Sequence, residues 1–374
     1  MADNLLHVVF TGGGTGGHLF PALAVANQLA ARVSRVRITF AGSGKEFERR
    51  HVADAQFDYF ALRCRPVPGR IREALAFLAD NLAGYRASSR FLQQHRVHAV
   101  VGTGGYASAP MARAAVARKV PLVLLEQNVV PGKATRWLAR SATLVCAAFE
   151  SNGRVWRRNC PLRVTGTPIR DGFARRPARN SEKRLVILGG SAGARSLNES
   201  VPRALYKVGR RIDGWQILHQ TGRLGLDATR NLYRKLGLTA TVEAFISDMP
   251  GTLAASELAV SRSGGTTLAE LAAAGVPALL VPYPHAADDH QLKNAERFAA
   301  AGGAVTLDPR ELNGRLDDHL AAALSGLLDE SGKRTRMVSA IRRLARPDAA
   351  EDVAAMILDV ISGQPHRRGL STAA

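Results

Sequence analysis

The glycine-rich run Thr11–Pro21 constrains the fold of this chain more than any other stretch of the sequence. It joins an apolar stretch at Leu5–Phe10 to a helix-like stretch at Ala22–Leu29, and glycine fills five of the six positions from Gly12 to Gly17. A strand that enters a helix through such a turn presents backbone N–H groups to a ligand without side chains in the way. Glycine at this density costs backbone entropy, which favours a ligand-binding loop over a simple turn.

The rest of the chain repeats this alternation of short apolar runs and helix-like segments. Near-continuous apolar strands between helices indicate parallel sheets covered on both faces. The pattern stops at Thr167 and restarts at Leu185, and 374 residues are too many for one typical core. We therefore expect an α/β protein with two Rossmann-like, doubly wound domains that face each other across a cleft. The predicted units are an N-terminal domain at 1–166, a linker at 167–184, a C-terminal domain at 185–348, a helix at 349–363 that packs back toward the N-terminal domain, and a disordered tail at 364–374.

Three further glycine-rich loops follow predicted strands, at Gly102–Ser108, Gly189–Asn198 and Ser261–Glu270. The last two place helix N-termini at the cleft, an arrangement that binds diphosphate groups. We expect Glu270 in the first turn of its helix, where it suits hydrogen bonds from ribose hydroxyls. The alternative is a capping-box carboxylate that accepts a bond from a nearby backbone N–H.

Several familiar cofactor sites are excluded by sequence. The glycines at 12, 14 and 17 spell G-x-G-x-x-G, but the second strand ends Phe40–Gly44 without the acidic residue that an NAD site requires. The sequence contains no GxxxxGK[ST], HExxH or EF-hand pattern. Its three cysteines, Cys64, Cys146 and Cys160, lack CxxC spacing, which indicates a reducing compartment and no zinc site. We expect neither a metal ion nor a cofactor.

The charge of the chain is strongly positive and uneven. The net charge is +20, and residues 1–166 hold 23 of the 51 Lys+Arg but only 9 of the 31 Asp+Glu. A basic N-terminal half favours an anionic partner, whereas an arginine-rich genome is the alternative explanation. Nucleic acid is disfavoured as the partner because aromatic residues make up only 6% and the basic residues are scattered.

One segment of this basic half is predicted to touch a membrane surface. Ile71, Leu75, Leu78 and Leu82 recur at helical spacing, and Phe77, Tyr85 and six arginines surround them: Arg63, Arg65, Arg70, Arg72, Arg86 and Arg90. An apolar stripe rimmed with arginine fits an interfacial helix on an anionic leaflet, with an ordinary core-facing helix as the alternative. No apolar run approaches the roughly 20 residues that span a bilayer.

Several motifs in order resemble a known family. They are Thr15–Pro21, Gly104–Tyr106, Glu126–Asn128, Gly189–Ser191, Arg262–Glu270, Pro282–His285 and Asp289–Gln291. Together they are similar to the MurG family of bacterial transferases from Leu5 to about Ala301. The resemblance implies a GT-B fold and an inverting hexosyltransferase that moves GlcNAc from UDP-GlcNAc to the C4 hydroxyl of MurNAc in lipid I. The product would be the β-1,4 linkage of lipid II in peptidoglycan synthesis, with roles in cell-wall biogenesis, cell shape and cell division.

The resemblance also implies the binding residues. For UDP-GlcNAc they are Thr15, Gly16, Gly17, Asn128, Arg170, Ser191, Ile246, Gly265, Thr266, Thr267, Leu268, Ala269, Glu270 and Gln291. Gly104, Gly105 and Tyr106, in the first domain, would suit the acceptor diphosphate. Two departures matter: Ala192 stands where the family commonly has Gln, and the segment Pro284–Gln291 differs in length from some members, so either His290 or Gln291 could take the sugar contact. The implied location is the cytoplasmic face of the inner membrane, as a peripheral protein that other cell-wall enzymes could also contact.

His18 is the predicted catalytic residue. Attack by a sugar hydroxyl requires a base, and an imidazole at the exit of the first loop suits that role. His18 could instead only bind a sugar hydroxyl, and Glu126 and His285 are weaker candidates for the base. A GT-B transferase or a UDP-sugar epimerase that acts on a soluble substrate is the competing function, and it would need neither the apolar stripe nor the Gly104–Tyr106 loop.

Overall fold

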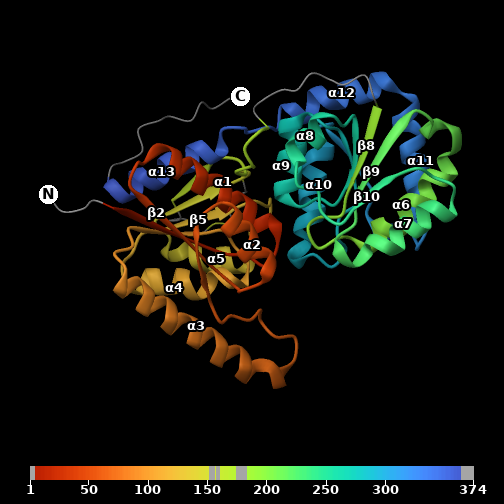
Figure 1. The fold of residues 1–374 in the computed structure, drawn as a ribbon. Helices are drawn as coiled ribbons and strands as arrows, with labels where there is room; N and C mark the ends of the chain where they lie inside the picture. Colours follow the sequence, from red (N-terminus) through yellow and green to blue (C-terminus); the bar gives the residue numbers. More distant parts are fainter. Residues whose placement is uncertain (1–4, 151–155, 157–160, 174–182, 364–374) are drawn as a thin grey trace.

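The computed structural model describes residues 5–150, 156, 161–173 and 183–363, and its chain forms two parallel β-sheets, each with helices on both faces (Figure 1). The first sheet has the strand order β3-β2-β1-β4-β5-β6-β7 and the second has the order β10-β9-β8-β11-β12-β13. The strands of the first are β1 (Leu6–Thr11), β2 (Val36–Gly42), β3 (Asp58–Ala61), β4 (Ala99–Gly102), β5 (Leu122–Glu126), β6 (Leu144–Ala147) and β7 (Leu162–Val164). Those of the second are β8 (Lys183–Leu188), β9 (Trp215–Gln220), β10 (Thr241–Glu243), β11 (Leu258–Ser261), β12 (Ala278–Leu280) and β13 (Ala304–Thr306). The predicted pair of doubly wound parallel sheets is confirmed.

The central strands are apolar on both faces because helices cover both. Val8, Val9 and Phe10 of β1 are all buried, although successive residues of a strand point to opposite faces. In the second sheet β8 begins at Lys183, which pairs with Trp215 of β9. β8 therefore starts two residues before the predicted apolar run at Leu185. The apolar pattern does not include these two residues because both of their side chains are charged.

The helices form one layer on each face of each sheet. In the N-terminal domain, α1 (Gly16–Arg32), α2 (Glu46–Asp54) and α13 (Ala349–Ser362) pack on one face, and α3 (Ala74–Gln94), α4 (Ala109–Ala117) and α5 (Lys133–Leu138) pack on the other. In the C-terminal domain, α6 (Arg195–Val208), α7 (Leu226–Lys235) and α11 (Leu316–Asp329) share one core, and α8 (Met249–Ala254), α9 (Gly265–Ala274) and α10 (His290–Ala300) share the other. α12 (Ser331–Arg342) contributes to both cores of the second domain.

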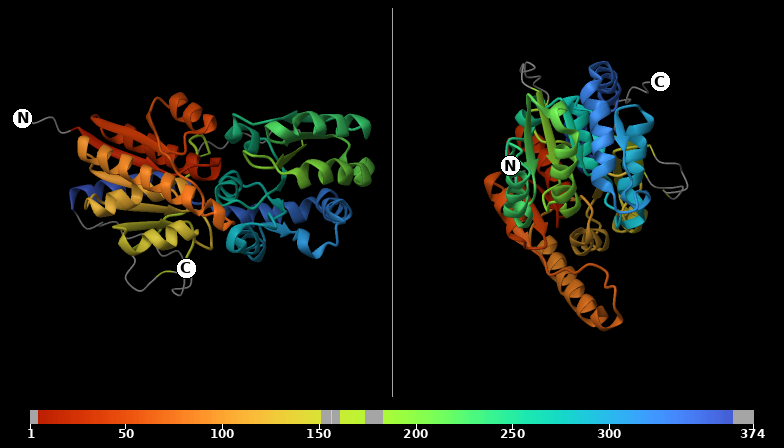
Figure 2. Two further views of the ribbon diagram at one scale, coloured as in Figure 1. Left: turned by 90° about the horizontal axis from the view of Figure 1, so that it is seen from below. Right: turned by 90° about the vertical axis from the view of Figure 1, so that its right-hand side faces the viewer.

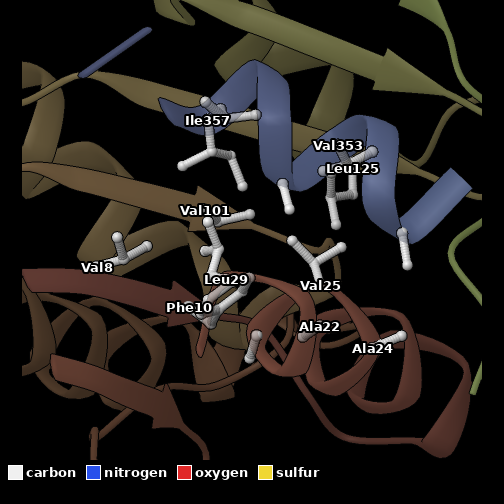
Figure 3. Close-up of a cluster of buried hydrophobic side chains, with 14 of the residues drawn as sticks. Val8, Phe10, Ala22, Ala24, Val25, Leu29, Val101, Leu125, Val353 and Ile357 are labelled. Atoms are coloured by element: carbon white, nitrogen blue, oxygen red, sulfur yellow. The ribbon is translucent and has the colours of Figure 1, made fainter. Parts of the chain in front are cut away.

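The last helix, α13, belongs to the core of the first domain. Val353 and Ile357 are fully buried with Val25 and Leu29 of α1, and Figure 3 shows these side chains between the two helices. Residues 174–182 of the predicted linker and the predicted tail at 364–374 lie outside the described residues.

α3 projects from the body of the N-terminal domain (Figure 2). The exposed fraction is 95% for Ile71, which lies in the 3₁₀ turn before α3, and 80% for Leu75. Leu78 and Leu82 are exposed too, so the core-facing alternative for this stripe is wrong. Arg63 and Arg65 form ion pairs with Asp80 at the edge of the stripe. No helix in the described part of the chain has the length and apolar character needed to cross a membrane.

Candidate active site

The four glycine-rich loops lie at two equivalent points of the two sheets. In each sheet the strand order reverses between neighbouring strands, β1 and β4 in the first and β8 and β11 in the second. Loops at the carboxyl ends of such strands form the crevice in which doubly wound sheets bind ligands. The first and second loops follow β1 and β4, and the third and fourth follow β8 and β11. The fold thus brings all four to ligand-binding positions.

The loops of the two domains contact each other directly. The N–H of Gly16 donates to Ser191 Oγ at 3.2 Å, and Thr266 Oγ1 donates to the carbonyl of Gly17 at 2.9 Å. Gly265, at the start of α9, lies so close to the Gln127 carbonyl that a Cβ there would overlap it. The N-termini of α1 and α9 and the third loop therefore meet where the domains face each other.

His18 is held at this junction in one tautomer. Its Nδ1 lies 2.9 Å from the carbonyl of Thr103, and because a carbonyl only accepts, Nδ1 carries the hydrogen and the lone pair is on Nε2. Burial lowers the pKa of His18, against the opposing effect of Glu126 and of the Thr103 hydrogen bond. A neutral imidazole with its lone pair on Nε2 can accept a proton.

Glu126, the weaker candidate for the base, instead holds the loop that follows β5. Its Oε1 accepts from the backbone N–H and side-chain Nδ2 of Asn128, at 3.0 and 3.1 Å, and its Oε2 accepts from Gly132 at 2.9 Å. Three donors engage both oxygens of this carboxylate, which favours a role in orienting Asn128 over a role as the base. Asn294 of α10 then ties the loop to the other domain, because Asn294 Nδ2 donates to Asn128 Oδ1 and its Oδ1 accepts from Val129, each at 2.9 Å.

Arg170 and Glu270 form a buried bidentate ion pair. Arg170 Nε lies 2.8 Å from Glu270 Oε1 and Nη2 lies 3.0 Å from Oε2. Burial raises the pKa of Glu270, and Arg170 opposes this shift. The guanidinium carbon lies 4.5 Å from the ring centre of Phe20, a residue of α1. Arg170 thus contacts one residue from each domain, Glu270 of α9 and Phe20 of α1.

Two expectations for Glu270 are wrong. α9 begins at Gly265, so Glu270 lies in its second turn and not in its first. The capping-box alternative fails as well, because both carboxylate oxygens bond to Arg170 and not to a backbone N–H.

The other predicted donor residues surround the same junction. Ile246 is buried and its N–H donates to Gln220 Oε1 at 3.0 Å, while Leu268 is a core residue whose N–H donates to Gly264. Thr267 and Ala269 lie on α9, and Thr15 is the residue before α1. Gln291 is held by a bond from the N–H of Tyr283 to its Oε1, at 3.0 Å, whereas His290 bonds the carbonyl of Ala287.

The second loop lies beside His18 and the first loop. A Cβ on Gly104 or Gly105 would come within 3.3 Å of the His18 ring, and both glycines have positive φ. Tyr106 begins the short 3₁₀ helix that follows and lies next to Gly14. His285 is exposed, with its ring centre 5.6 Å from that of Tyr283.

Sequence reasoning missed three residues of this region. Asn294 bridges the domains, Phe20 covers Arg170, and Glu48 contacts the first glycine loop. A buried Asn or Glu on a helix has no local sequence pattern that separates it from a surface residue, so only Phe20, inside the Thr15–Pro21 motif, carried a signal. Within the residues that the structure describes, no cluster of His, Cys, Asp or Glu could hold a metal ion.

Two doubly wound domains with facing nucleotide-type loops define an enzyme of the GT-B fold. Residues 8–147 match the glycosyltransferase family 28 N-terminal domain and residues 184–353 match the glycosyltransferase family 28 C-terminal domain. The chain belongs to glycosyltransferase family 28, and the competing epimerase function is therefore wrong.

Individual relatives agree with this assignment. Proteins of Methylococcus capsulatus and Alkalilimnicola ehrlichii are each 38% identical, over 94% of this chain and 98% of their own. Both are named UDP-N-acetylglucosamine–N-acetylmuramyl-(pentapeptide) pyrophosphoryl-undecaprenol N-acetylglucosamine transferase. The crystal structure of Acinetobacter baumannii MurG is similar as well, with a TM-score of 0.72 and 30% identity over 95% of this chain and 99% of that one.

Proposed function

We propose that this glycosyltransferase moves N-acetylglucosamine from UDP-GlcNAc to the C4 hydroxyl of the N-acetylmuramyl group in lipid I, the pyrophosphoryl-undecaprenol-linked pentapeptide. The observation that carries the proposal is the direct contact between the glycine loops of the two domains, Gly16 with Ser191 and Gly17 with Thr266. It puts the N-termini of α1 and α9 beside the third loop. Helix N-termini suit the departing diphosphate of a UDP-sugar. The names of the relatives supply the sugar and the acceptor.

The donor side of the proposed site is built mainly by the C-terminal domain. Glu270 would accept hydrogen bonds from the ribose hydroxyls, and the backbone of Ile246 would read the uracil edge. Ser191 and the start of α9 would meet the diphosphate. Asn128 and Gln291 would contact the sugar, and the fixed side chain of Gln291 favours it over His290 for this role.

In the proposed reaction the bond changes occur at the anomeric carbon. The O4 oxygen of the acceptor attacks C1 of GlcNAc from the face opposite UDP, and a new C1–O4 bond forms with β configuration. The bond between C1 and the diphosphate oxygen breaks, and UDP leaves with its electron pair. The proton of the O4 hydroxyl moves to Nε2 of His18, whose Nδ1 hydrogen is held by Thr103. Backbone N–H groups at the helix N-termini stabilise the charge that develops on the diphosphate.

The acceptor would approach from the N-terminal domain and a membrane surface. Ile71, in the 3₁₀ turn, and Leu75, Leu78 and Leu82 of α3 are exposed, with Arg70 and Arg72 exposed beside them. α3 projects from the domain (Figure 2). Apolar side chains rimmed with arginine favour insertion into an anionic leaflet. We therefore infer a peripheral position on the cytoplasmic face of the inner membrane, with the Gly104–Tyr106 loop near the acceptor diphosphate.

The test is transfer of radiolabelled GlcNAc from UDP-GlcNAc to lipid I in detergent micelles. We expect transfer by the wild-type protein, and none when UDP-GlcNAc is replaced by NAD or lipid I by free N-acetylmuramyl pentapeptide. A melting-temperature increase with UDP-GlcNAc that exceeds the increase with UDP-glucose or UDP-GalNAc would support the donor choice. Failure to label lipid I, or equal transfer to the soluble pentapeptide, would refute the proposal.

A further inference from the structure

We propose that Glu48 is a positioning residue that holds the first glycine loop in its active geometry. The inference rests on the proposed function, because the loop matters through His18 and the donor. Glu48 lies on α2, outside every motif that identified the site, and only 1% of its surface is exposed. A buried carboxylate is costly unless hydrogen-bond donors surround it, so its partners indicate what it does.

The Glu48 carboxylate accepts hydrogen bonds from three different segments. Its Oε1 accepts from the N–H of Gly14 and from Ser43 Oγ, both at 2.6 Å, and its Oε2 accepts from the Tyr59 hydroxyl at 2.5 Å. Tyr59 is itself fixed, because its oxygen accepts from the N–H of Gly44 at 2.8 Å. The loops after β1 and β2 and the strand β3 are thus joined through one side chain.

Two glycines make room for this carboxylate. A Cβ on Gly13 would lie 2.5 Å from Glu48 Oε1, and a Cβ on Gly42 would overlap Oε2. Gly13 also has a φ of +141°, which side-chain-bearing residues rarely adopt. The high glycine content of the first loop therefore serves, in part, to fit the loop around an internal anion.

This arrangement differs from that of a dinucleotide-binding loop. There, the backbone N–H groups of G-x-G-x-x-G point at the ligand's pyrophosphate. Here the Gly14 N–H is already bound to Glu48, and the Gly16 N–H bonds Ser191 of the other domain. The expectation that the first loop presents its backbone N–H groups to a ligand is therefore wrong at Gly14.

The loop transmits its position to the catalytic side of the site. On the face away from Glu48, the carbonyl of Gly13 lies 3.0 Å from where a Cβ of Gly105 would be, and the His18 ring packs on Gly104 and Gly105. The first loop is thus clamped between Glu48 and the second loop. Loss of the carboxylate would release one side of this clamp and let the start of α1, with His18, move relative to the donor. Displacements of about 1 Å can lower a rate by about 100-fold.

The test compares five variants: Glu48→Ala, Glu48→Gln, Tyr59→Phe, the double variant Glu48→Gln/Tyr59→Phe, and Glu46→Ala as the control. Glu46 is an exposed carboxylate on the same helix. Three quantities are measured: kcat for GlcNAc transfer to lipid I, the Kd of UDP by calorimetry, and hydrogen exchange of the amides at 11–18.

We expect Glu48→Ala to lower kcat by roughly 10- to 100-fold and to accelerate exchange at 11–18, because the loop loses its anchor. The Kd of UDP should stay within about twofold, because the nucleotide binds mainly to the C-terminal domain. Glu46→Ala should match the wild-type protein in all three measurements. Equal kcat values for Glu48→Ala and Glu46→Ala would overturn the proposal, and so would an equal loss of UDP binding and kcat.

The conservative variants keep the test decisive if Glu48→Ala does not fold. Gln can keep its oxygen toward Gly14 and Ser43, but its Nε2 is a donor and cannot accept from the Tyr59 hydroxyl; Tyr59→Phe removes the same Tyr59-to-Glu48 hydrogen bond. The two single variants should therefore have similar, small effects on kcat, and the double variant should be no slower than the slower single variant. Multiplicative losses in the double variant would overturn the proposal. If the wild-type protein transfers no GlcNAc while the exchange difference at 11–18 remains, the proposed function fails and the role of Glu48 in the loop stands.

Discussion

The Arg170–Glu270 ion pair allows a quantitative prediction about a residue of the donor site. Removing a single partner of a fully buried ion pair costs about 3–5 kcal/mol, because the remaining charge is left without compensation. The Glu270 side chain is only 4% exposed, but Arg170 is 18% exposed. The guanidinium also keeps its contact with Phe20, and an interaction of that kind contributes roughly 0.5–2 kcal/mol. We therefore expect Glu270→Ala to destabilise the protein by about 2–3 kcal/mol.

The assay is thermal unfolding with and without UDP-GlcNAc. For domains of 150–250 residues, each kcal/mol shifts the melting temperature by about 2–4 °C, so Glu270→Ala should unfold roughly 4–12 °C earlier. Because the variant also lacks the proposed ribose contact, UDP-GlcNAc should stabilise it much less than the wild-type protein. The control is Glu199→Ala, which breaks the surface pair with Arg195 and should leave both values unchanged.

A double-mutant cycle isolates the pair from its surroundings. If the two charges compensate each other, Arg170→Ala/Glu270→Ala should be clearly more stable than the sum of the two single losses implies. Strict additivity would refute the reasoning, since it would mean that neither residue depends on the other. A melting temperature for Glu270→Ala within about 1 °C of the wild-type value would refute it as well.

Three further outcomes are expected. His18→Gln should lower kcat by roughly 100- to 10,000-fold. Because burial lowers the pKa of His18, the wild-type kcat should be constant above pH 7 and fall only at acidic pH; a rise in kcat from pH 7 to 8 would contradict this. Ile71→Glu/Leu75→Glu should abolish sedimentation with anionic vesicles but leave UDP binding intact, and retained sedimentation would argue against the interfacial helix. Burial lowers the pKa of His219 to about 3, so between about pH 6.5 and 3 the unfolded chain binds a proton at this residue and the folded protein does not. The melting temperature should therefore fall as the pH is lowered through that range. His219→Gln should weaken the fall, whereas the control His285→Gln should not.

The sequence was sufficient to predict the repeating architecture and the positions of the loops. Parallel strands buried on both faces read as apolar runs, and Leu5–Phe10 and Leu185–Leu188 differ from β1 and β8 by at most two residues. The glycine runs after these strands are local signals too. Because the doubly wound topology places such loops at the points where the strand order reverses, their location at a shared crevice followed from the pattern alone.

Contacts between distant segments could not be predicted in the same way. Asn294 lies 166 residues from Asn128, and nothing in the local sequence marks either residue as the partner of the other. Glu48 lies on an amphipathic helix, and the sequence alone does not distinguish a buried glutamate there from an exposed one. The pairing of Glu270 with Arg170 depends on the path of the chain between the domains. Such partners are chosen by the tertiary structure, which a single sequence does not display.

The position of α13 has a consequence for the order in which the protein folds during synthesis. The N-terminal domain cannot finish its core when its own sheet has been translated, because Val353 and Ile357 close the apolar surface of α1. Until the ribosome has completed the second domain, Val25 and Leu29 lack part of their packing. Domains usually mature in the order of their synthesis, starting from the N-terminus. Here the first domain to leave the ribosome is the last to be completed, and a prematurely ended chain would expose the apolar face of α1.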